Sequence, residues 1–433
     1  MKDFSPFQIV LISLFVVAAL AGLYAFTTFS GFGGAKQEIG KVVIWGTLPQ
    51  EAVDAGINNL NESGDDYAEV SYVERAPATF SSDLANAIAS GSGPDLILIS
   101  QEELLTERAK LTVIPFDSIP QRTFVNSYLP IFELFLTSEG TYGIPLVVDP
   151  LVLYYNRSIL ASAGIANPPV TWEAVSGLAA NLTSRDDRGT VLRSFIPLGE
   201  YGNVNNARAT LSLLLLQAGS KIASDSGGGP RSTLLSEEPV LGSTPAESAV
   251  AFYTQFADPA KNVYSWNRSL PQSRQAFLSG DLILYPGFAS ERPYLSAANP
   301  NLDFDVAAIP QPGSSATKTG FSLAYALALP KQSMNPTGAV SVAYALSSEA
   351  PMLRVAEALS AAPARRSLLI PSSSDRYAAV FYAEALAARG WLSPAPYVTD
   401  AIFSAMIGNV IAGRADIPGA IQKADQALNA VLR

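Results

Sequence analysis

The stretch from Tyr142 to Leu182 constrains the fold more than any other part of the sequence, because it predicts several consecutive local structures. Pro145 offers no backbone donor, and it keeps the preceding residue, Ile144, out of the helical region. The apolar run that continues as far as Tyr155 is therefore predicted to be a strand. This part of the chain is expected to be extended, with a bend at its prolines.

A short helix, a rigid arm and a second helix are predicted next. Ser158 to Ala163 has the length of one short helix, and Gly164 stands where a helix end needs a positive φ. The pair Pro168-Pro169 then favours a stiff extended segment. Thr171 can cap the following helix, whose apolar residues recur on one face. Those residues are Val175, Leu178, Ala179 and Leu182.

The order and identity of these residues resemble the family 1 extracellular solute-binding proteins of ABC importers, a family that includes maltose-binding protein. Its members carry a residue series where the chain first crosses between two lobes, and this sequence matches that series at 15 positions. The matched residues are Tyr142, Gly143, Ile144, Pro145, Asp149, Tyr154, Tyr155, Asn156, Ala163, Gly164, Ile165, Pro168, Pro169, Thr171 and Trp172. The resemblance implies an α/β, two-lobed periplasmic-binding-protein fold (type II) that binds its ligand without turnover.

Two further segments carry the same resemblance. Gly93-Pro94-Asp95 opens an apolar run to Ser100, which is predicted to be a strand covered on both sides. The run Leu282 to Tyr285 is a second predicted strand, and it leads to Phe288, where relatives often have tryptophan. The resemblance covers roughly Lys41 to Arg433.

Composition excludes several classes of protein. The chain has 433 residues, of which 48% are hydrophobic and 15% charged, so a disordered protein is excluded. A formal net charge of −10 argues against a nucleic-acid partner, because no basic surface is available to replace counterions. The absence of cysteine and histidine removes thiolate nucleophiles, cysteine metal sites and the commonest general base. We therefore expect no enzyme, no cofactor and no metal site.

The first residues predict a membrane anchor. Phe7 to Phe26 is 20 residues long and carries no charge, which is the length that a membrane-spanning helix needs. Lys2 precedes it and no cation follows until Lys36, which places the N-terminus in the cytoplasm and the rest outside. We expect a single-pass signal anchor over 1–29 and a flexible tether over 30–40. A signal peptide cleaved near Ala19-Leu20-Ala21 is the alternative.

The resemblance also implies how the lobes divide the chain. Crossovers are expected near 146–150, 308–312 and 346–351, so each lobe is discontinuous in sequence. Lobe one is expected to comprise 41–148 with 309–346, and lobe two 149–308 with 347–433. Binding is then expected to close the lobes by hinge bending.

The candidate ligand-binding residues are aromatic and polar residues at predicted strand ends and loops. Sugars present C–H faces that stack on aromatic rings and hydroxyl groups that pair with short polar groups. The candidates are Trp45, Thr47, Gln101, Asp149, Glu200, Tyr201, Trp266, Phe288 and Arg365. Each aromatic residue could equally belong to the core, and Asp149 could instead be a hinge carboxylate that caps nearby backbone.

The ligand is expected to be a neutral mono- or oligosaccharide. A phosphorylated ligand would need a cationic cleft, and only Arg365 and Arg366 are candidate cleft cations. The other expected partners are an ABC permease and the membrane, and a monomer is expected. Two alternatives stay open: a carboxylate-dependent glycoside hydrolase or lyase, and a surface sensor or adhesion protein on the same fold.

Overall fold

The first strands and helices alternate as a parallel β-α-β-α-β unit. They are β1 (Val42–Gly46), α2 (Gln50–Glu62), β2 (Val70–Glu74), α3 (Phe80–Ala89) and β3 (Leu96–Ser100). β1 lies between β2 and β3 and is parallel to both. All five residues of β3 are buried, which confirms the prediction of a strand covered on both sides.

The computed structural model describes residues 39–432 except 63–66, 68, 118, 226–228, 240–241 and 371–375. The expected anchor over 1–29 and nearly all of the expected tether over 30–40 lie outside these residues. Among the helices that the structure describes, none combines the length and apolar character needed to cross a bilayer. From Gly40 onward the chain forms one compact unit.

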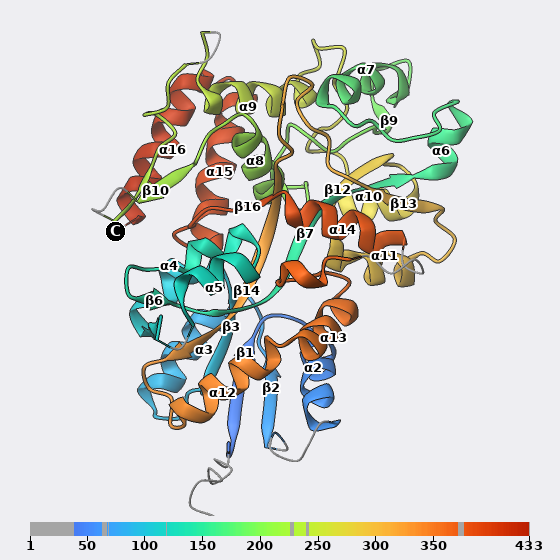
Figure 1. The fold of residues 1–433 in the computed structure, drawn as a ribbon. Helices are drawn as coiled ribbons and strands as arrows, with labels where there is room; N and C mark the ends of the chain where they lie inside the picture. Colours follow the sequence, from blue (N-terminus) through green and yellow to red (C-terminus); the bar gives the residue numbers. More distant parts are fainter. Residues whose placement is uncertain are drawn as a thin grey trace, which may run out of the picture. The chain divides into compact units, whose positions relative to one another are not determined.

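β7 (Ile144–Asn156) is the long strand predicted from the proline-bounded apolar run. Its first half lies between β14 (Gly320–Pro330) and the short strand β15 (Ala362–Pro363). Its second half lies between β12 (Leu284–Phe288) and β13 (Phe304–Ala307). The main sheet therefore has the order β12-β7-β14-β3-β1-β2, and Figure 1 shows β7 and β14 extending from the β1–β3 group toward β12.

The partner strand of β7 changes at one peptide unit. Pro150 is opposite Ser322 of β14, whereas Leu151 is opposite Phe288 of β12. Proline has no N–H, so a hydrogen-bond ladder can be interrupted there without leaving a donor unpaired. The expected first crossover near 146–150 coincides with this change of partner.

The helices after β7 follow the predicted signals. Thr171 caps α7 (Trp172–Leu182) by accepting a hydrogen bond from Ala174 N at 3.3 Å. α8 (Ala207–Gln217) is buried along most of its length, as its apolar sequence predicts. α9 (Pro245–Thr254) begins with a capping box between Thr244 and Glu247.

The remaining helices and short strands complete the structure. The other α-helices are α4 (Leu104–Glu107), α5 (Gln121–Ser127), α6 (Arg157–Ser162), α10 (Ser273–Ser279), α11 (Arg292–Ala298), α12 (Pro336–Leu346), α13 (Glu349–Leu359), α14 (Arg376–Leu386), α15 (Pro396–Ile411) and α16 (Ile417–Val431). The 3₁₀ segments are η2 (Arg108–Lys110), η3 (Pro130–Phe135), η4 (Gln255–Ala257), η5 (Ala289–Glu291) and η6 (Arg366–Leu368). The short strands are β4 (Leu111–Thr112), β5 (Ile114–Pro115), β6 (Gly140–Thr141), β8 (Ser184–Arg185), β9 (Val191–Arg193), β10 (Ala223–Asp225), β11 (Pro230–Ser232) and β16 (Ala388–Arg389).

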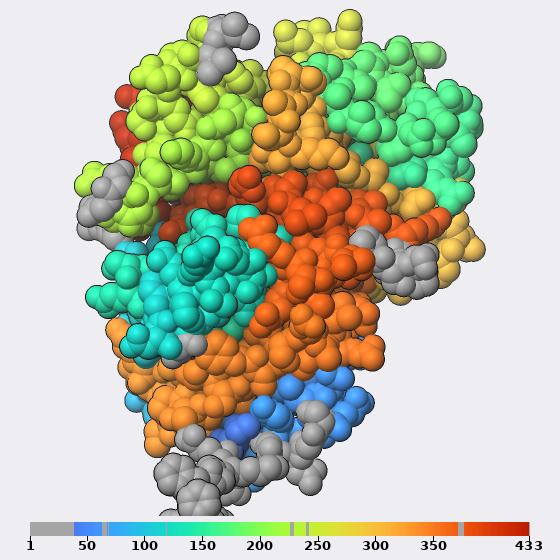
Figure 2. Space-filling model, viewed as in Figure 1, coloured from blue at the N-terminus to red at the C-terminus, as the bar shows by residue number. Residues whose placement is uncertain are grey.

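Segments distant in the sequence share one face of the molecule. Figure 2 shows the orange and red residues of the last third of the chain across the middle of this face, between cyan residues on one side and green residues on the other. The buried apolar side chains form two clusters. One contains Ile97 and Phe132, and the other contains Leu213 and Phe403.

α13 packs against α2, which differs from the expectation that everything after residue 347 belongs to lobe two. The contact depends on Gly56, because a Cβ built there would lie 2.5 Å from Val355 Cγ2 and 3.1 Å from Pro351 O. The two helix backbones thus approach closely, and 349–359 lies with the β1–β3 group. We keep the lobe division as a proposal, with its last boundary moved to Ser360.

Gly56→Ala is expected to lower the free energy of unfolding by about 1–3 kcal/mol, because the new methyl group overlaps Val355. This loss should outweigh the gain of roughly 1 kcal/mol that alanine brings to a helix interior. Urea unfolding followed by circular dichroism measures the difference.

Gly177→Ala in α7 is the matched control, since nothing lies within 4 Å of a Cβ at that position. This variant should be more stable than the wild type by about 0.5–1 kcal/mol. Equal effects of the two substitutions would contradict the close packing of α13 on α2.

Candidate functional site

The carboxyl ends of the parallel strands β1, β2 and β3 form one edge of the sheet, and this edge meets α8. Side chains that follow parallel strands gather at such an edge, where α/β proteins commonly bind ligands. Glu102, which follows β3, forms an ion pair with Arg208 of α8 at 2.8 Å. Groups from both halves of the molecule therefore come together here.

Trp45 and Thr47 lie at the end of β1. Trp45 is 8% exposed, and the Arg75 guanidinium lies over its ring at 3.7 Å from the centroid. This cation–π contact occupies one face of the indole. Thr47 is half-buried. The structure places both residues at the end of a strand, as predicted, but little of the Trp45 ring is exposed there.

Gln101 is fully buried and joins two strands. Its Nε2 donates to Ser322 O at 3.0 Å, and its Oε1 accepts from Ala324 N at 2.7 Å. Both ends of the amide are thus used in holding β14 beside the end of β3. In this structure the residue is part of the sheet framework.

Glu103 is a residue that our sequence reasoning missed. Its Oε2 accepts hydrogen bonds from Ser100 N at 2.9 Å and from Ser100 Oγ at 3.0 Å. Burial raises the pKa of this carboxyl to about 7. The signal was present, because the acidic pair Glu102-Glu103 lies just beyond the buried strand β3, separated from it by Gln101, and buried carboxylates need a polar site or a partner.

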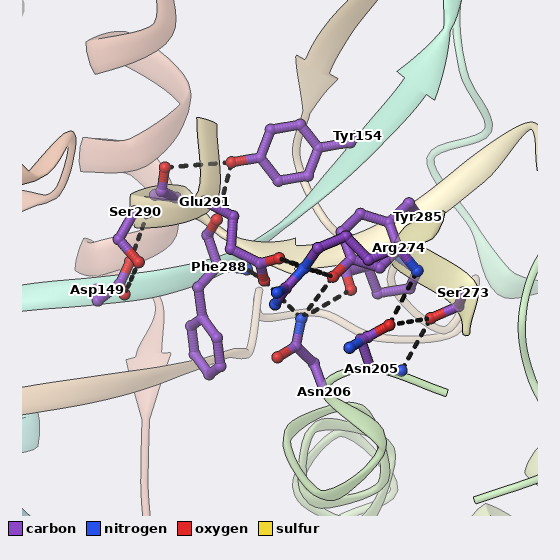
Figure 3. Close-up of polar contacts among 12 residues, drawn as sticks. Asp149, Tyr154, Asn205, Asn206, Ser273, Arg274, Tyr285, Phe288, Ser290 and Glu291 are labelled. Carbon is purple, nitrogen blue, oxygen red and sulfur yellow. Dashed lines mark hydrogen bonds and ion pairs between the residues drawn. The ribbon is translucent and has the colours of Figure 1, made fainter. Parts of the chain in front are cut away.

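Asp149 and Phe288 meet at the point where β7 changes partner. Asp149 is 4% exposed, and its carboxylate accepts from Ser290 N at 3.1 Å and from Ser290 Oγ at 2.6 Å. Burial raises the pKa of Asp149 to about 7. Phe288 is half-buried, with its ring 6.5 Å from that of Phe321. Asp149 thus joins β7 to the turn that carries Phe288, as Figure 3 shows.

Glu291 fixes this turn from the other side. Its Oε1 accepts from Asn206 Nδ2 at 2.6 Å and from Phe288 N at 2.9 Å. Its Oε2 accepts from Tyr285 OH at 2.7 Å and from Arg274 Nε at 2.8 Å. Figure 3 shows these groups pointing toward the Glu291 carboxylate. A carboxylate with this many donors holds the turn rigidly.

Tyr201 and Glu200 lie before α8. The Tyr201 hydroxyl donates to Asp400 Oδ1 at 2.7 Å, and burial raises its pKa. Asp400 also pairs with Arg208, so Tyr201 joins the charged group at the sheet edge. Glu200 pairs instead with Arg268 at 3.3 Å, whose side chain is largely exposed.

Trp266 and Arg365 are engaged in other contacts. Trp266 is 1% exposed and its Nε1 donates to Asn203 Oδ1 at 3.0 Å. Arg365 Nε donates to Ser347 O at 2.7 Å, and its guanidinium lies 5.1 Å from the Tyr128 ring centroid. All four tryptophans of the chain are buried, with exposed fractions of 8% or less: Trp45, Trp172, Trp266 and Trp391.

Within the described residues, no group of three or more Asp and Glu side chains is arranged to hold a metal ion. The carboxylates of the site are held instead by hydrogen-bond donors and arginines.

The lobes, the shared strand β7 and the polar groups at the ends of the parallel strands define a two-lobed α/β binding protein. The chain belongs to the bacterial extracellular solute-binding protein family, whose sequence profile matches residues 60–351. This is a family of binding proteins rather than of enzymes.

Solved structures share the fold at low sequence identity. An ABC transporter solute-binding protein from Thermotoga lettingae with bound α-D-tagatose has 20% identity and a TM-score of 0.67, and the match covers 91% of this chain and 100% of that one. A cyclic α-maltosyl-1,6-maltose-binding protein from Arthrobacter globiformis has 18% identity and a TM-score of 0.72, with 90% and 98% covered. A cyclo/maltodextrin-binding protein with maltotetraose has 14% identity and a TM-score of 0.72, with 92% and 98% covered.

Curated relatives match over a shorter stretch. A protein of Brucella abortus named as a binding protein is 28% identical over 100 residues, which is 23% of this chain and 24% of the relative. A protein of Brucella suis matches to the same extent. The match therefore spans about a quarter of the length of these relatives.

Asp149→Asn should change how stability depends on pH. Because burial raises the pKa of Asp149 from 3.8 to about 7, the folded protein binds a proton more tightly than the unfolded chain does. This carboxyl thus favours the folded state at low pH, and its contribution is lost as the pH rises toward and through 7. As the pH is raised from 5 to 8, thermal unfolding should show that the wild type loses stability relative to Asp149→Asn. A difference that is constant over this range would contradict the burial of Asp149.

Proposed function

We propose that the protein is an extracytoplasmic solute-binding protein that captures a neutral mono- or oligosaccharide between its lobes. The observation that carries this proposal is the meeting of both halves of the molecule at the ends of β1–β3, where Glu102 lies 2.8 Å from Arg208. Family membership and the fold shared with sugar-bound structures support it.

The ligand class is inferred from the groups at this edge. Carboxyl, hydroxyl and guanidinium groups pair with sugar hydroxyls, and the half-buried rings of Phe288 and Tyr201 can pack on C–H faces. Because all four tryptophans are buried, stacking is assigned to these two rings. Structures that share the fold hold tagatose, maltotetraose or mannotriose as bound sugars.

We propose further that the protein works from the membrane surface. The uncharged segment Phe7–Phe26 is long enough to span a bilayer, and no cysteine is available for attachment through a lipid. The domain would then stand outside the cell on the tether over 30–40, as a type II binding protein that delivers its solute to an ABC permease. We also propose that it acts as a monomer.

Closure is proposed to bend the chain where β7 changes partner. Pro150 and Leu151 pair with different strands, so a rotation there disturbs few ladder hydrogen bonds. A ligand that binds the closed form better than the open form then shifts the population toward closure.

A thermal-shift screen against neutral sugars, sugar phosphates and cationic solutes tests the ligand class. A ligand at a hundred times its Kd should stabilise the protein by about 2.7 kcal/mol. We expect a neutral sugar to raise the melting temperature. A rise with phosphorylated or cationic solutes only would overturn the carbohydrate assignment.

Phe288→Ala should weaken sugar binding and raise the Kd roughly tenfold, because a stacked ring contributes about 1.5 kcal/mol. Phe252→Ala is the matched control, because it also removes a half-buried ring, one that lies in α9 and packs against Trp172. Isothermal titration with the sugar from the screen should give wild-type affinity for this control. Equal loss in both variants would contradict the place assigned to Phe288.

A further inference from the structure

A chain of charged side chains crosses the sheet edge. Arg208 of α8 donates from Nη2 to Glu102 Oε2 at 2.8 Å and from Nη1 to Asp400 Oδ2 at 2.6 Å. Asp400 lies on α15 and also accepts from Tyr201 OH at 2.7 Å. The Arg208 guanidinium thus links Glu102, after β3, to Asp400 of α15.

The two ends of this chain belong to different halves of the molecule. Glu102 lies two residues after the end of β3, which pairs with β1 and β14. α8 packs against α9, and α15 packs against α16 and α9. A hydrogen bond between uncharged groups also joins the two halves: Thr106 Oγ1 donates to Pro394 O at 2.8 Å. Separation of the two halves would break the Glu102–Arg208 pair but leave Arg208–Asp400 intact.

The Glu102 side chain is desolvated but incompletely paired. It is 2% exposed, and its Oε1 is buried without a hydrogen-bond partner. Arg208 Nε is also buried and without a partner. A buried ion pair gains Coulomb energy but loses the hydration of both charges, and unpaired atoms reduce the net gain. The net gain of this contact is therefore smaller than that of a buried ion pair whose atoms are all paired.

We propose that Glu102 and Arg208 form a latch that holds the two lobes together before any ligand is bound. The inference rests on the two-lobed hinge of the proposed function. Asp400 and Tyr201 keep Arg208 directed toward Glu102 while the lobes are apart, so the guanidinium is already oriented when they close. The latch thereby sets the population of the open state that is available to capture a solute.

The test measures the distance between lobes without ligand. The full-length chain in detergent carries nitroxide labels at Asn86→Cys in α3 and Gln422→Cys in α16, and it has no native cysteine that could compete for the label. Double electron–electron resonance then reports the closed and open populations. Glu102→Gln should shift the ratio toward the open form by about tenfold, within the range typical of coupling between two states.

Arg354→Gln is the matched control. It removes an exposed ion pair with Glu357 within α13, at 3.3 Å, and it should leave the distance distribution unchanged. Thr106→Val removes the hydrogen bond to Pro394 O and should shift the populations less than Glu102→Gln does.

An unchanged distribution in Glu102→Gln, with circular dichroism showing the variant folded, would overturn the latch. If Glu102→Gln does not fold, Arg208→Gln in the same labelled chain decides the question by the same criterion. The distance measurement uses no ligand. Failure of every sugar to bind would therefore count against the proposed function but would not affect the test of the latch.

Discussion

The structure depends on one strand that two lobes share. β7 pairs with β14 and β15 up to Pro150, and with β12 and β13 from Leu151 onward. Buried backbone donors and acceptors have to remain paired, so neither lobe can leave β7. The change of partner at Pro150 is the place where we propose that the chain bends when the lobes close. There Asp149, held by Ser290, joins the strand to the turn before α11.

Most of the fold could be predicted from local signals. Pro145 and the apolar run after it indicated β7, and Thr171 indicated the start of α7. The packing of α13 on α2 could not be predicted, because it depends on the absence of a side chain at Gly56 and on residues almost 300 positions later. The close approach of two helix backbones leaves no periodic pattern in the sequence of either helix.

The site was harder to predict than the fold. Aromatic residues at strand ends look alike in a sequence, whether they face a ligand or fill the core, and Trp266 fills the core. Gln101 stands after a strand, as a binding residue would, yet its amide holds two strands together. Glu102 and Arg208 form the ion pair at this edge, and only the folded chain shows that the two residues meet.

Hydrogen–deuterium exchange with and without the sugar from the thermal-shift screen tests the central claim most directly. Capture between lobes predicts slower exchange in 101–107 and in 288–292 at the same sugar concentration, with the amides of β1 unaffected. Protection confined to one of these segments, or found only far from the sheet edge, would contradict capture between the lobes.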